Sequence, residues 1–185
     1  IRRIHDDGVD FKSHIDGSMH TFTPESVMEI QRALGADVIM AFDECPPGGC
    51  DQRTAEESVE RTLRWLKRCR DRLVALEKET PGPMQSLFPV LQGNVFDGIR
   101  REHASRVVEL ADWHGYGIGG LSVGESKEDM WRTLEILHNV LPTNRPRYLM
   151  GVGYPDDLLE AIARGCDLFD CVAPTRNARH GTAWT

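Results

Sequence analysis

Three polar side chains stand at the ends of apolar runs in which buried strands are expected. Asp43 follows the run 37–42, Gln92 follows the run 86–91, and Asp170 ends a shorter one. Two carboxylates suit acid–base catalysis or glycosyl transfer, in which one carboxylate attacks the anomeric carbon of a sugar. An aspartate with an amide also offers acceptors and donors to the edge of a planar heterocycle. These residue types predict chemistry on a sugar or a base.

Alternating strand and helix patterns must position these side chains. Short apolar runs predict five buried parallel strands, at 37–42, 86–91, 116–119, 147–152 and 167–172. Amphipathic stretches predict four helices between them, at about 54–79, 97–113, 127–140 and 155–164. Thr54 and Glu57 have capping-box spacing, so the first of these helices is expected to begin near Thr54.

This alternation predicts an α/β fold, and its spacing is typical of a (β/α) barrel. An open doubly wound sheet fits the same pattern and stays possible at this point. In barrels the active site lies at the carboxyl ends of the strands. Those ends carry Asp43, Gln92, Gly120, Met150 and Asp170.

The N-terminal segment predicts a hairpin and then a helix. Asp16-Gly17 lies between two β-type runs, and this pair favours the positive φ angles of a tight turn. Thr23 and Pro24 suit an N-cap and a first helical position, and Gly35 suits the end of that helix.

Composition excludes several classes of protein. The 185 residues carry a net charge of −7, which disfavours a surface coated with basic residues but leaves room for a local basic patch. No apolar run approaches the roughly 18 residues that span a bilayer. The five irregularly spaced cysteines favour a reduced, cytoplasmic setting over a disulfide framework. A start without Met, and without the apolar region of a signal peptide, predicts a fragment of a longer protein.

Two other kinds of site are disfavoured by spacing. The glycine-rich segment 119–125 (GGLSVGE) lacks the glycine order of a dinucleotide-binding loop and the Lys-Ser/Thr of a P-loop. Cys45 and Cys50, with His14 or His20, have poor spacing for metal ligands, so no metal site is expected in this chain.

Six ordered segments carry a resemblance to a known family: FKSHIDGS, MAFDECPP, LQG, GGLSVGE, YLMGVG and FDCVAPTRNARHG. They resemble the queuine tRNA-ribosyltransferase, or tRNA-guanine transglycosylase, family over essentially the whole chain. The resemblance implies a (β/α)8 barrel and exchange of guanine 34 in tRNA anticodons for a 7-deazaguanine, a step of queuosine biosynthesis. Residues 1–185 would then form a single partial barrel domain that covers the middle to late strands.

The resemblance assigns the central chemical role to Asp170. In the motif FDCVAPTR it matches the nucleophile that attacks C1′ of the ribose, expels guanine and forms a covalent RNA–enzyme intermediate. The incoming base then displaces the enzyme with net retention, by the two-step logic of retaining glycosidases.

The same resemblance implies a set of base-binding groups. Asp43, Gln92 and the backbone N–H of Gly120 match the groups that read the guanine-like edge. The carbonyl of Leu121 matches the group that faces the aminomethyl substituent of 7-aminomethyl-7-deazaguanine, the pre-queuosine base. Glu125 matches the residue that orients the neighbouring peptide.

Further positions line the implied pocket or set its specificity. Tyr148 and Met150 resemble lining residues, and Met150 is expected to cover one face of the base. Cys45 and Val123 resemble bacterial members, which use the small pre-queuosine base. Val in place of Gly removes volume where a bulkier substituent would project. Glu44 is expected to be structural and to pair with an arginine.

Three residues after the nucleophile are expected to contact RNA. Arg176, Arg179 and His180 resemble contacts to the phosphates and neighbouring bases of the anticodon loop. A few correctly placed cations suffice for phosphate contacts, so this partner agrees with the net charge of −7.

Two family features are expected outside this chain. A DSGGFQ-like segment with a second aspartate, a general acid–base, should lie upstream of Ile1. A CxCxxC…H motif that binds Zn²⁺ should lie downstream of Thr185. The family also implies a homodimer. Because a partial barrel exposes unpaired strand edges, the isolated chain is expected to be poorly stable.

Three rival functions remain at this point. An archaeosine-type transglycosylase is disfavoured by Cys45 and Val123. The non-catalytic partner subunit of the eukaryotic heterodimer, a tRNA-binding protein, is disfavoured by Asp43, Gln92 and Asp170 together. An unrelated barrel lyase or aldolase would need a Schiff-base Lys or metal ligands at strand ends.

Overall fold

The computed structural model describes residues 2–183. Its strands are β1 (Arg2–His5), β2 (Gly8–Lys12), β3 (Met19–Phe22), β4 (Val38–Met40), β5 (Ser86–Phe88), β6 (Val90–Leu91), β7 (Tyr116–Ile118), β8 (Arg147–Leu149) and β9 (Leu168–Phe169). Its helices are α1 (Pro24–Leu34), α2 (Gln52–Glu79), α3 (Asp97–Leu110), α4 (Lys127–His138), α5 (Pro155–Ala163) and α6 (Ala173–Arg179).

The strands from β4 to β9 follow one another in chain order, and every pairing among them is parallel. β5 and β6 belong to one run that Pro89 divides, since proline has no N–H for a ladder. The Pro89 carbonyl accepts the N–H of Gly117 at 2.8 Å, and the Phe88 carbonyl accepts that of Ala41 at 2.9 Å. The run thus links β4 to β7. The α/β fold with five parallel strand runs and four intervening helices is confirmed.

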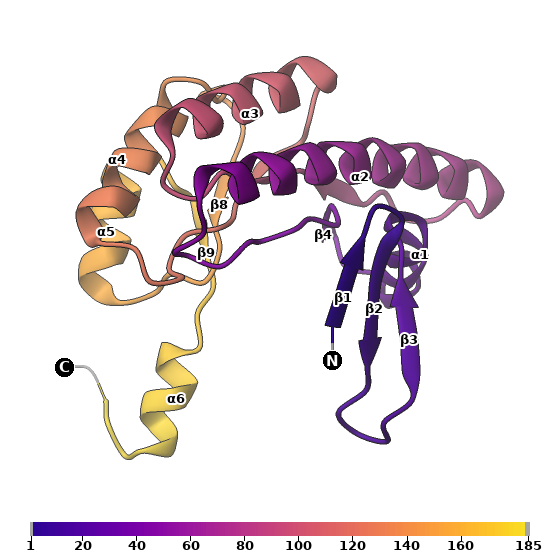
Figure 1. Cartoon of the computed structure of the whole chain (residues 1–185), viewed down its shortest axis with the longest axis horizontal. Helices are drawn as coiled ribbons and strands as arrows, with labels where there is room; N and C mark the ends of the chain where they lie inside the picture. The colour runs from indigo at the N-terminus through magenta and orange to yellow at the C-terminus, as the bar shows by residue number, and fades with distance from the viewer. Residues whose placement is uncertain (1, 184–185) are drawn as a thin grey trace.

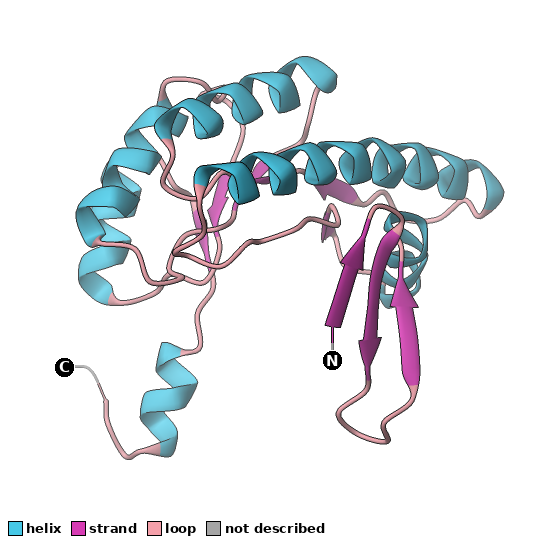
Figure 2. Ribbon diagram, viewed as in Figure 1, coloured by secondary structure: helices cyan, strands magenta, loops and turns pink. Residues whose placement is uncertain are grey.

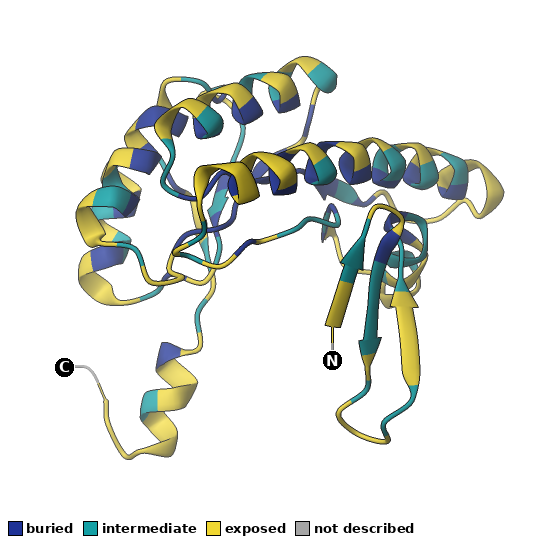
Figure 3. Ribbon diagram, viewed as in Figure 1, coloured by how far each residue is buried: buried dark blue, intermediate teal, exposed yellow. Residues whose placement is uncertain are grey.

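Helices α2 to α5 form an arc with the parallel strands on its inner side (Figures 1 and 2). Their buried faces point inward (Figure 3). In α2, for example, Val59, Leu63, Leu66 and Leu73 recur at helical spacing and all belong to the core. The arc therefore presents the carboxyl ends of neighbouring strands along one continuous edge.

The parallel strands are shorter than the apolar runs that predict them. β4 ends at Met40, although Ala41 is buried and the apolar run continues to Phe42. The Ala41 N–H still bonds to the Phe88 carbonyl, but the Phe42 N–H bonds to Cys69 Sγ at 3.3 Å while its side chain packs against the core. The apolar run therefore extends beyond the ladder, and hydrophobicity alone overestimates strand length. As a result Asp43 and Asp170 lie in loops just beyond β4 and β9.

Two predicted helix ends are wrong. α2 begins at Gln52, because Asp51 is its N-cap and accepts the N–H of Thr54 at 2.8 Å; the capping box at Thr54 does not form. α3 ends at Leu110 rather than near Trp113. The Trp113 indole instead turns back and donates to the carbonyl of Val107 at 2.8 Å.

The first three strands form a separate antiparallel sheet, β1-β2-β3. The predicted hairpin exists, but its loop spans 13–18 and is not a tight two-residue turn. Only Gly17 of the Asp16-Gly17 pair has positive φ (+79°). The helix signals at Thr23, Pro24 and Gly35 are confirmed as the caps of α1. β1 was not predicted, because its sequence, RRIH, is too polar to show the alternation of apolar and polar residues that marks a strand.

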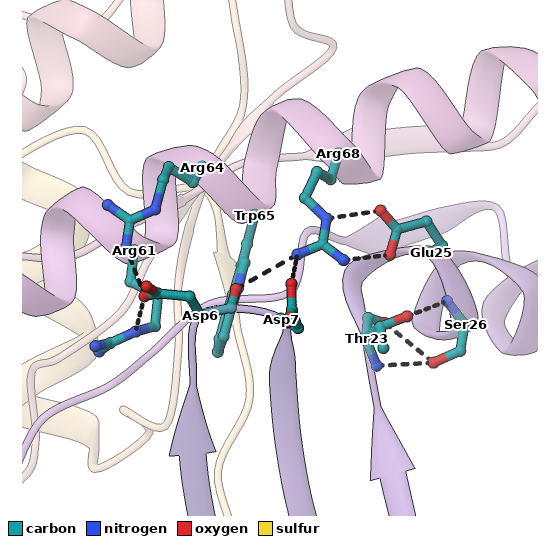
Figure 4. Close-up of polar contacts among 9 residues, drawn as sticks. All are labelled: Asp6, Asp7, Thr23, Glu25, Ser26, Arg61, Arg64, Trp65 and Arg68. Carbon is teal, nitrogen blue, oxygen red and sulfur yellow. Dashed lines mark hydrogen bonds and ion pairs between the residues drawn. The ribbon is translucent and has the colours of Figure 1, made fainter.

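The turn between β1 and β2 is fastened to α2 (Figure 4). The Trp65 indole donates to the Asp6 carbonyl at 2.7 Å, and Arg64 pairs with the Asp6 carboxylate at 2.8 Å. One turn further along α2, Arg68 holds Glu25 of α1 with two hydrogen bonds of 2.7 Å. The antiparallel sheet and α1 are thus tied to the first helix of the arc.

Helix α6 follows β9, stands apart from the arc and is mostly exposed (Figures 1 and 3). It was predicted neither as a helix nor as a strand, because Ala173–Arg179 lacks an apolar period. No helix within residues 2–183 is long and apolar enough to cross a membrane.

Candidate active site

Asp43 and Gln92 meet at the carboxyl ends of β4 and β6. The Gln92 Nε2 group donates to Asp43 Oδ2 at 2.6 Å. Burial raises the pKa of Asp43 to about 6; the Gln92 hydrogen bond opposes this shift, and the negative charge of Glu44 adds to it. A carboxylate with such a pKa changes charge near neutrality, so its acceptor strength depends on pH.

The other amide atom of Gln92 is unsatisfied. Gln92 is 1% exposed, and its Oε1 is buried without a hydrogen-bond partner in the part of the chain that the structure describes. The backbone N–H of Gln92 donates to His103 Nδ1 at 3.0 Å, which fixes the start of this loop. A buried acceptor without a partner is costly unless a ligand supplies a donor.

The backbone at position 120 requires a glycine. Its φ of +65° favours glycine, and a Cβ there would collide with Gln92 Oε1. Cys45 lies close to both residues: desolvation and the charge of Asp43 raise its pKa, while the Gly120 backbone and the Gln92 side chain oppose the shift. The structure thus brings Asp43, Cys45, Gln92 and Gly120 together.

The loop after β7 is held by Glu125. One carboxylate oxygen accepts the N–H of Ser122, and the other accepts that of Val123 at 2.9 Å. Ser122 has a φ of +59°, a strained conformation that these bonds stabilise. Leu121 is buried and Val123 is 41% exposed. A Cβ on Gly48 would collide with the Val123 carbonyl, so the loops after β4 and β7 pack closely.

Asp170 lies exposed at the end of β9. The Tyr148 hydroxyl donates to Asp170 Oδ1 at 2.7 Å, and the Gly151 N–H donates to the same oxygen at 2.8 Å. Burial and the Asp170 carboxylate raise the pKa of Tyr148 to about 12, so the phenol stays a donor. Among the residues described, no hydrogen bond reaches Oδ2. One oxygen of this exposed carboxylate is therefore fixed by two donors, and the other accepts none from the described residues.

A cavity of about 420 Å³ lies between the loops after β7, β8 and β9; Cys171, the next residue after Asp170, lines it, but Asp170 itself does not. Glu125, Gly151, Cys171 and Arg176 contribute to its wall. Arg179 and His180 are exposed at the end of α6. The cavity connects the loop held by Glu125 with the helix that carries the predicted RNA contacts.

Two further predicted residues, Met150 and Glu44, are held by contacts with neighbouring strands and with α2. Met150 is half-buried, and its sulfur would lie 3.6 Å from a Cβ on Gly117, a position that Met40 also approaches. Glu44 pairs with Arg61, as expected of a structural residue. The Glu44 N–H also bonds to Thr62 Oγ1 at 3.1 Å, which fastens the loop after β4 to α2.

Arg100 and His103 were missed in the sequence. Both are buried and lie on the core-facing side of α3 with Ala104 and Val107, at helical spacing. Burial lowers the pKa of His103 to about 4, so its imidazole is neutral and Nδ1 can accept from Gln92. A charged residue and a histidine at core-facing positions of an amphipathic pattern were the available signal.

No group of three or more His, Cys, Asp or Glu side chains within residues 2–183 is arranged to hold a metal ion. These residues therefore provide no cluster of ligands for Zn²⁺.

Fold and site define an α/β protein whose polar groups gather where neighbouring parallel strands end. The whole chain, residues 1–185, matches the family model described as "Queuine tRNA-ribosyltransferase". The chain therefore belongs to that family, and the resemblance seen in its motifs is confirmed.

Individual relatives agree. The chain is 52% identical to the queuine tRNA-ribosyltransferase of Desulforamulus reducens over 185 residues, which are 100% of this chain and 48% of that relative. It is 52% identical over 184 residues to that of Symbiobacterium thermophilum (100% and 44%) and 49% identical over 185 residues to that of Halothermothrix orenii (100% and 48%). The chain thus spans about half the length of the curated relatives it matches.

Proposed function

We propose that the protein containing this chain is a glycosyltransferase that exchanges guanine 34 of tRNA anticodons for 7-aminomethyl-7-deazaguanine, in queuosine biosynthesis. The observation that carries the proposal is the buried, unpartnered Oε1 of Gln92 beside the Asp43 carboxylate. Guanine presents neighbouring N–H donors on one edge, and these two acceptors suit such an edge. The Gly120 N–H is a donor for the carbonyl oxygen of the base, and the Leu121 carbonyl is an acceptor for the aminomethyl group.

In the proposed reaction Asp170 Oδ2 attacks C1′ of the ribose at position 34. The bond between C1′ and N9 of guanine breaks, and guanine leaves with the bonding electron pair and takes a proton from the general acid–base, the second aspartate expected outside this chain. N9 of the incoming base then gives its proton back to that group and attacks C1′, and the Asp170 ester bond breaks. Two inversions give net retention. Tyr148 and Gly151 hold the other oxygen of Asp170, so the carboxylate is oriented before RNA binds.

Cys45 and Val123 are the proposed specificity residues. Val123 is 41% exposed on a loop that packs against Gly48, so its side chain narrows the space next to Leu121. A small aminomethyl substituent fits such a space better than a bulkier one. Met150 is proposed to cover one face of the base.

Arg176, Arg179 and His180 are the proposed RNA contacts. Arg176 lines the cavity that Cys171 also lines, Arg179 is exposed at the end of the same helix, and the exposed His180 follows it directly. Cations next to the nucleophile would bind the phosphates that flank nucleotide 34.

The larger assembly is also part of the proposal. The sequential parallel strands inside an arc of helices fit a segment of a (β/α)8 barrel, in which residues 1–185 are one partial catalytic domain. Zn²⁺ would be bound outside this chain, and the whole protein would be a cytoplasmic homodimer.

Incubation of the whole protein with guanine-34 tRNA and labelled guanine tests the function. We expect label to enter the tRNA and incorporation to be abolished in Asp170→Ala. A tRNA with adenine at position 34 is the control and should stay unlabelled. No incorporation by the wild-type protein, or undiminished incorporation by Asp170→Ala, would refute the proposal.

A further inference from the structure

Arg100 buries a guanidinium between the loops that follow β6 and β7. It is 1% exposed, and all its hydrogen bonds go to backbone carbonyls. Nε donates to Asn94 at 2.6 Å, Nη1 to Leu91 at 2.9 Å and Nη2 to Gly120 at 3.1 Å. One side chain therefore bridges two loops that carry proposed base-reading groups.

Burying the positive charge of Arg100 is unfavourable in itself. Burial lowers the pKa of Arg100 to about 10, while the negative charges of Cys45, when ionised, and Glu125 oppose the shift. The guanidinium stays protonated at neutral pH, and a buried cation is costly unless its donors are satisfied. Its fork of donors matches three carbonyls. Without it the carbonyls of Asn94 and Gly120 would lose the partner they have among the described residues, whereas the Leu91 carbonyl would keep the N–H of Gly119 at 3.0 Å.

The acceptors of Arg100 lie next to the groups that would touch the base. The Gly120 carbonyl belongs to the same peptide as the N–H of Leu121. The following peptide carries the Leu121 carbonyl and the N–H of Ser122, which donates to Glu125. The two peptides that flank Leu121 are therefore held by opposite charges, Arg100 on one and Glu125 on the other. Leu91 directly precedes Gln92 in the chain.

Close packing restricts movement of this arrangement. A Cβ on Gly120 would lie 3.2 Å from Arg100 Nη2, and a Cβ on Gly93 would lie 3.1 Å from the Arg100 backbone nitrogen. The backbone at Gly93 and Gly120 is therefore packed closely against Arg100.

We propose that Arg100 is a positioning residue that sets the Gln92 and Gly120–Leu121 segments for the base before the base binds. This inference rests on the proposed function, because it takes Gln92, Gly120 and Leu121 as the base-reading groups. Arg100 itself does not touch the base.

Arg147 provides a matched control. It is also a buried arginine (4% exposed) and donates to the carbonyls of Leu141 at 3.0 Å and Pro142 at 3.3 Å. It begins β8, so it lies at the opposite end of the parallel strands from the candidate site. Its loss should affect folding without affecting the base pocket.

The test measures the dissociation constant of guanine by calorimetry, without tRNA, on the whole protein. Arg100→Lys keeps the charge but loses the fork, and Arg100→Met removes both. We expect the dissociation constant to rise by about tenfold or more in either variant, the effect of misplacing one or two buried hydrogen bonds. Arg147→Lys should lower the melting temperature to a similar extent and leave guanine binding unchanged. Unchanged binding in a folded Arg100 variant would overturn the inference.

Hydrogen exchange on the wild-type protein gives a second test that needs no variant to fold. The amides of 121–124 should exchange slowly before guanine is added, because the loop is already set. Fast exchange that guanine suppresses would contradict a positioning role for Arg100. A wild-type protein that binds no guanine would instead refute the proposed function. The exchange rates of the amides of 121–124 would then still show whether this loop is held in place without a ligand, as the role of Arg100 requires.

Discussion

At the scale of single residues, the site depends on which polar atoms already have partners. Asp170 has two donors on one oxygen, and its other oxygen is available. The Gln92 amide group donates to Asp43, and within residues 2–183 its buried oxygen has no hydrogen-bond partner. The first arrangement supports the proposed role of Asp170 as nucleophile, and the second supports the proposed binding of a base that brings a donor.

Base binding should depend on pH through Asp43. Its raised pKa of about 6 means that the carboxyl is neutral below that pH and ionised above it. A base edge that donates N–H groups binds the ionised form, so affinity is full above pH 6 and is lost as pH falls. We expect the guanine dissociation constant to rise by about tenfold per pH unit below pH 6. Calorimetry from pH 5 to 8 measures this, and Asp43→Asn should remove the slope. A flat profile in the wild-type protein would contradict the role of Asp43.

Tyr148 should matter for the rate of attack and not for binding of the base. Tyr148→Phe removes one of the two donors that orient Asp170, which should slow formation of the covalent intermediate by about tenfold. The matched control is Tyr116→Phe, since Tyr116 is buried at the opposite end of β7. Single-turnover kinetics on the whole protein compare the two. Equal rates for both variants would show that the Tyr148 hydroxyl does not position Asp170.

At the scale of elements, local sequence signals predicted the order and type of the helices and strands better than the residues at which they begin and end. The apolar runs located the five parallel strand runs, and Thr23, Pro24 and Gly35 located α1. Strand lengths were overestimated because apolar packing continues beyond the ladder, as at Phe42, whose N–H bonds to Cys69 Sγ. α6 was missed because a short polar helix has no apolar period.

The candidate site was predicted as a set of strand ends, and of the residues that support it only Glu125 and Glu44 were predicted. Residue types gave Asp43, Gln92 and Asp170 as candidates, and the family resemblance added roles. The three carbonyl bonds of Arg100 join residues up to 20 positions apart, which no local pattern encodes. The same holds for the contact between Tyr148 and Asp170, 22 positions apart.

Two substitutions at the N-terminus of α2 distinguish the Asp51 N-cap of the structure from the Thr54 capping box predicted from the sequence. Asp51→Ala removes the N-cap that accepts the Thr54 N–H, so the free energy of unfolding should fall by about 1 kcal/mol. Thr54→Ala should cost less than about 0.5 kcal/mol, because Thr54 is inside the helix and does not cap it. Urea unfolding of the whole protein measures both. A larger loss in Thr54→Ala would favour the capping box predicted from the sequence.

At the scale of the whole molecule, the described part of the chain has an open architecture. β4 pairs only with β5, and β9 only with β8, within residues 2–183. Val38 and Leu168 in these edge strands are each 43% exposed, and Leu34 of the neighbouring α1 is 77% exposed. Apolar groups beside unpaired edges favour association over a stable monomer.

The isolated 185-residue chain should therefore be poorly stable. Its net charge of −7 aids solubility but does not cover the edges. We expect a circular dichroism melt without a cooperative transition above about 50 °C. The whole protein is the control and should melt cooperatively at a higher temperature. A cooperative transition of the isolated chain above that temperature would show that the arc is self-sufficient.

The most direct test of the account is to trap and map the covalent intermediate. The whole protein would be mixed with guanine-34 tRNA, quenched in denaturant and separated on a denaturing gel, and the adduct would be digested for mass spectrometry. If Asp170 is the nucleophile, a protein–RNA adduct forms whose ribose is attached to Asp170, and no adduct forms with Asp170→Asn. An adduct on another residue, or one that persists in Asp170→Asn, would contradict this role.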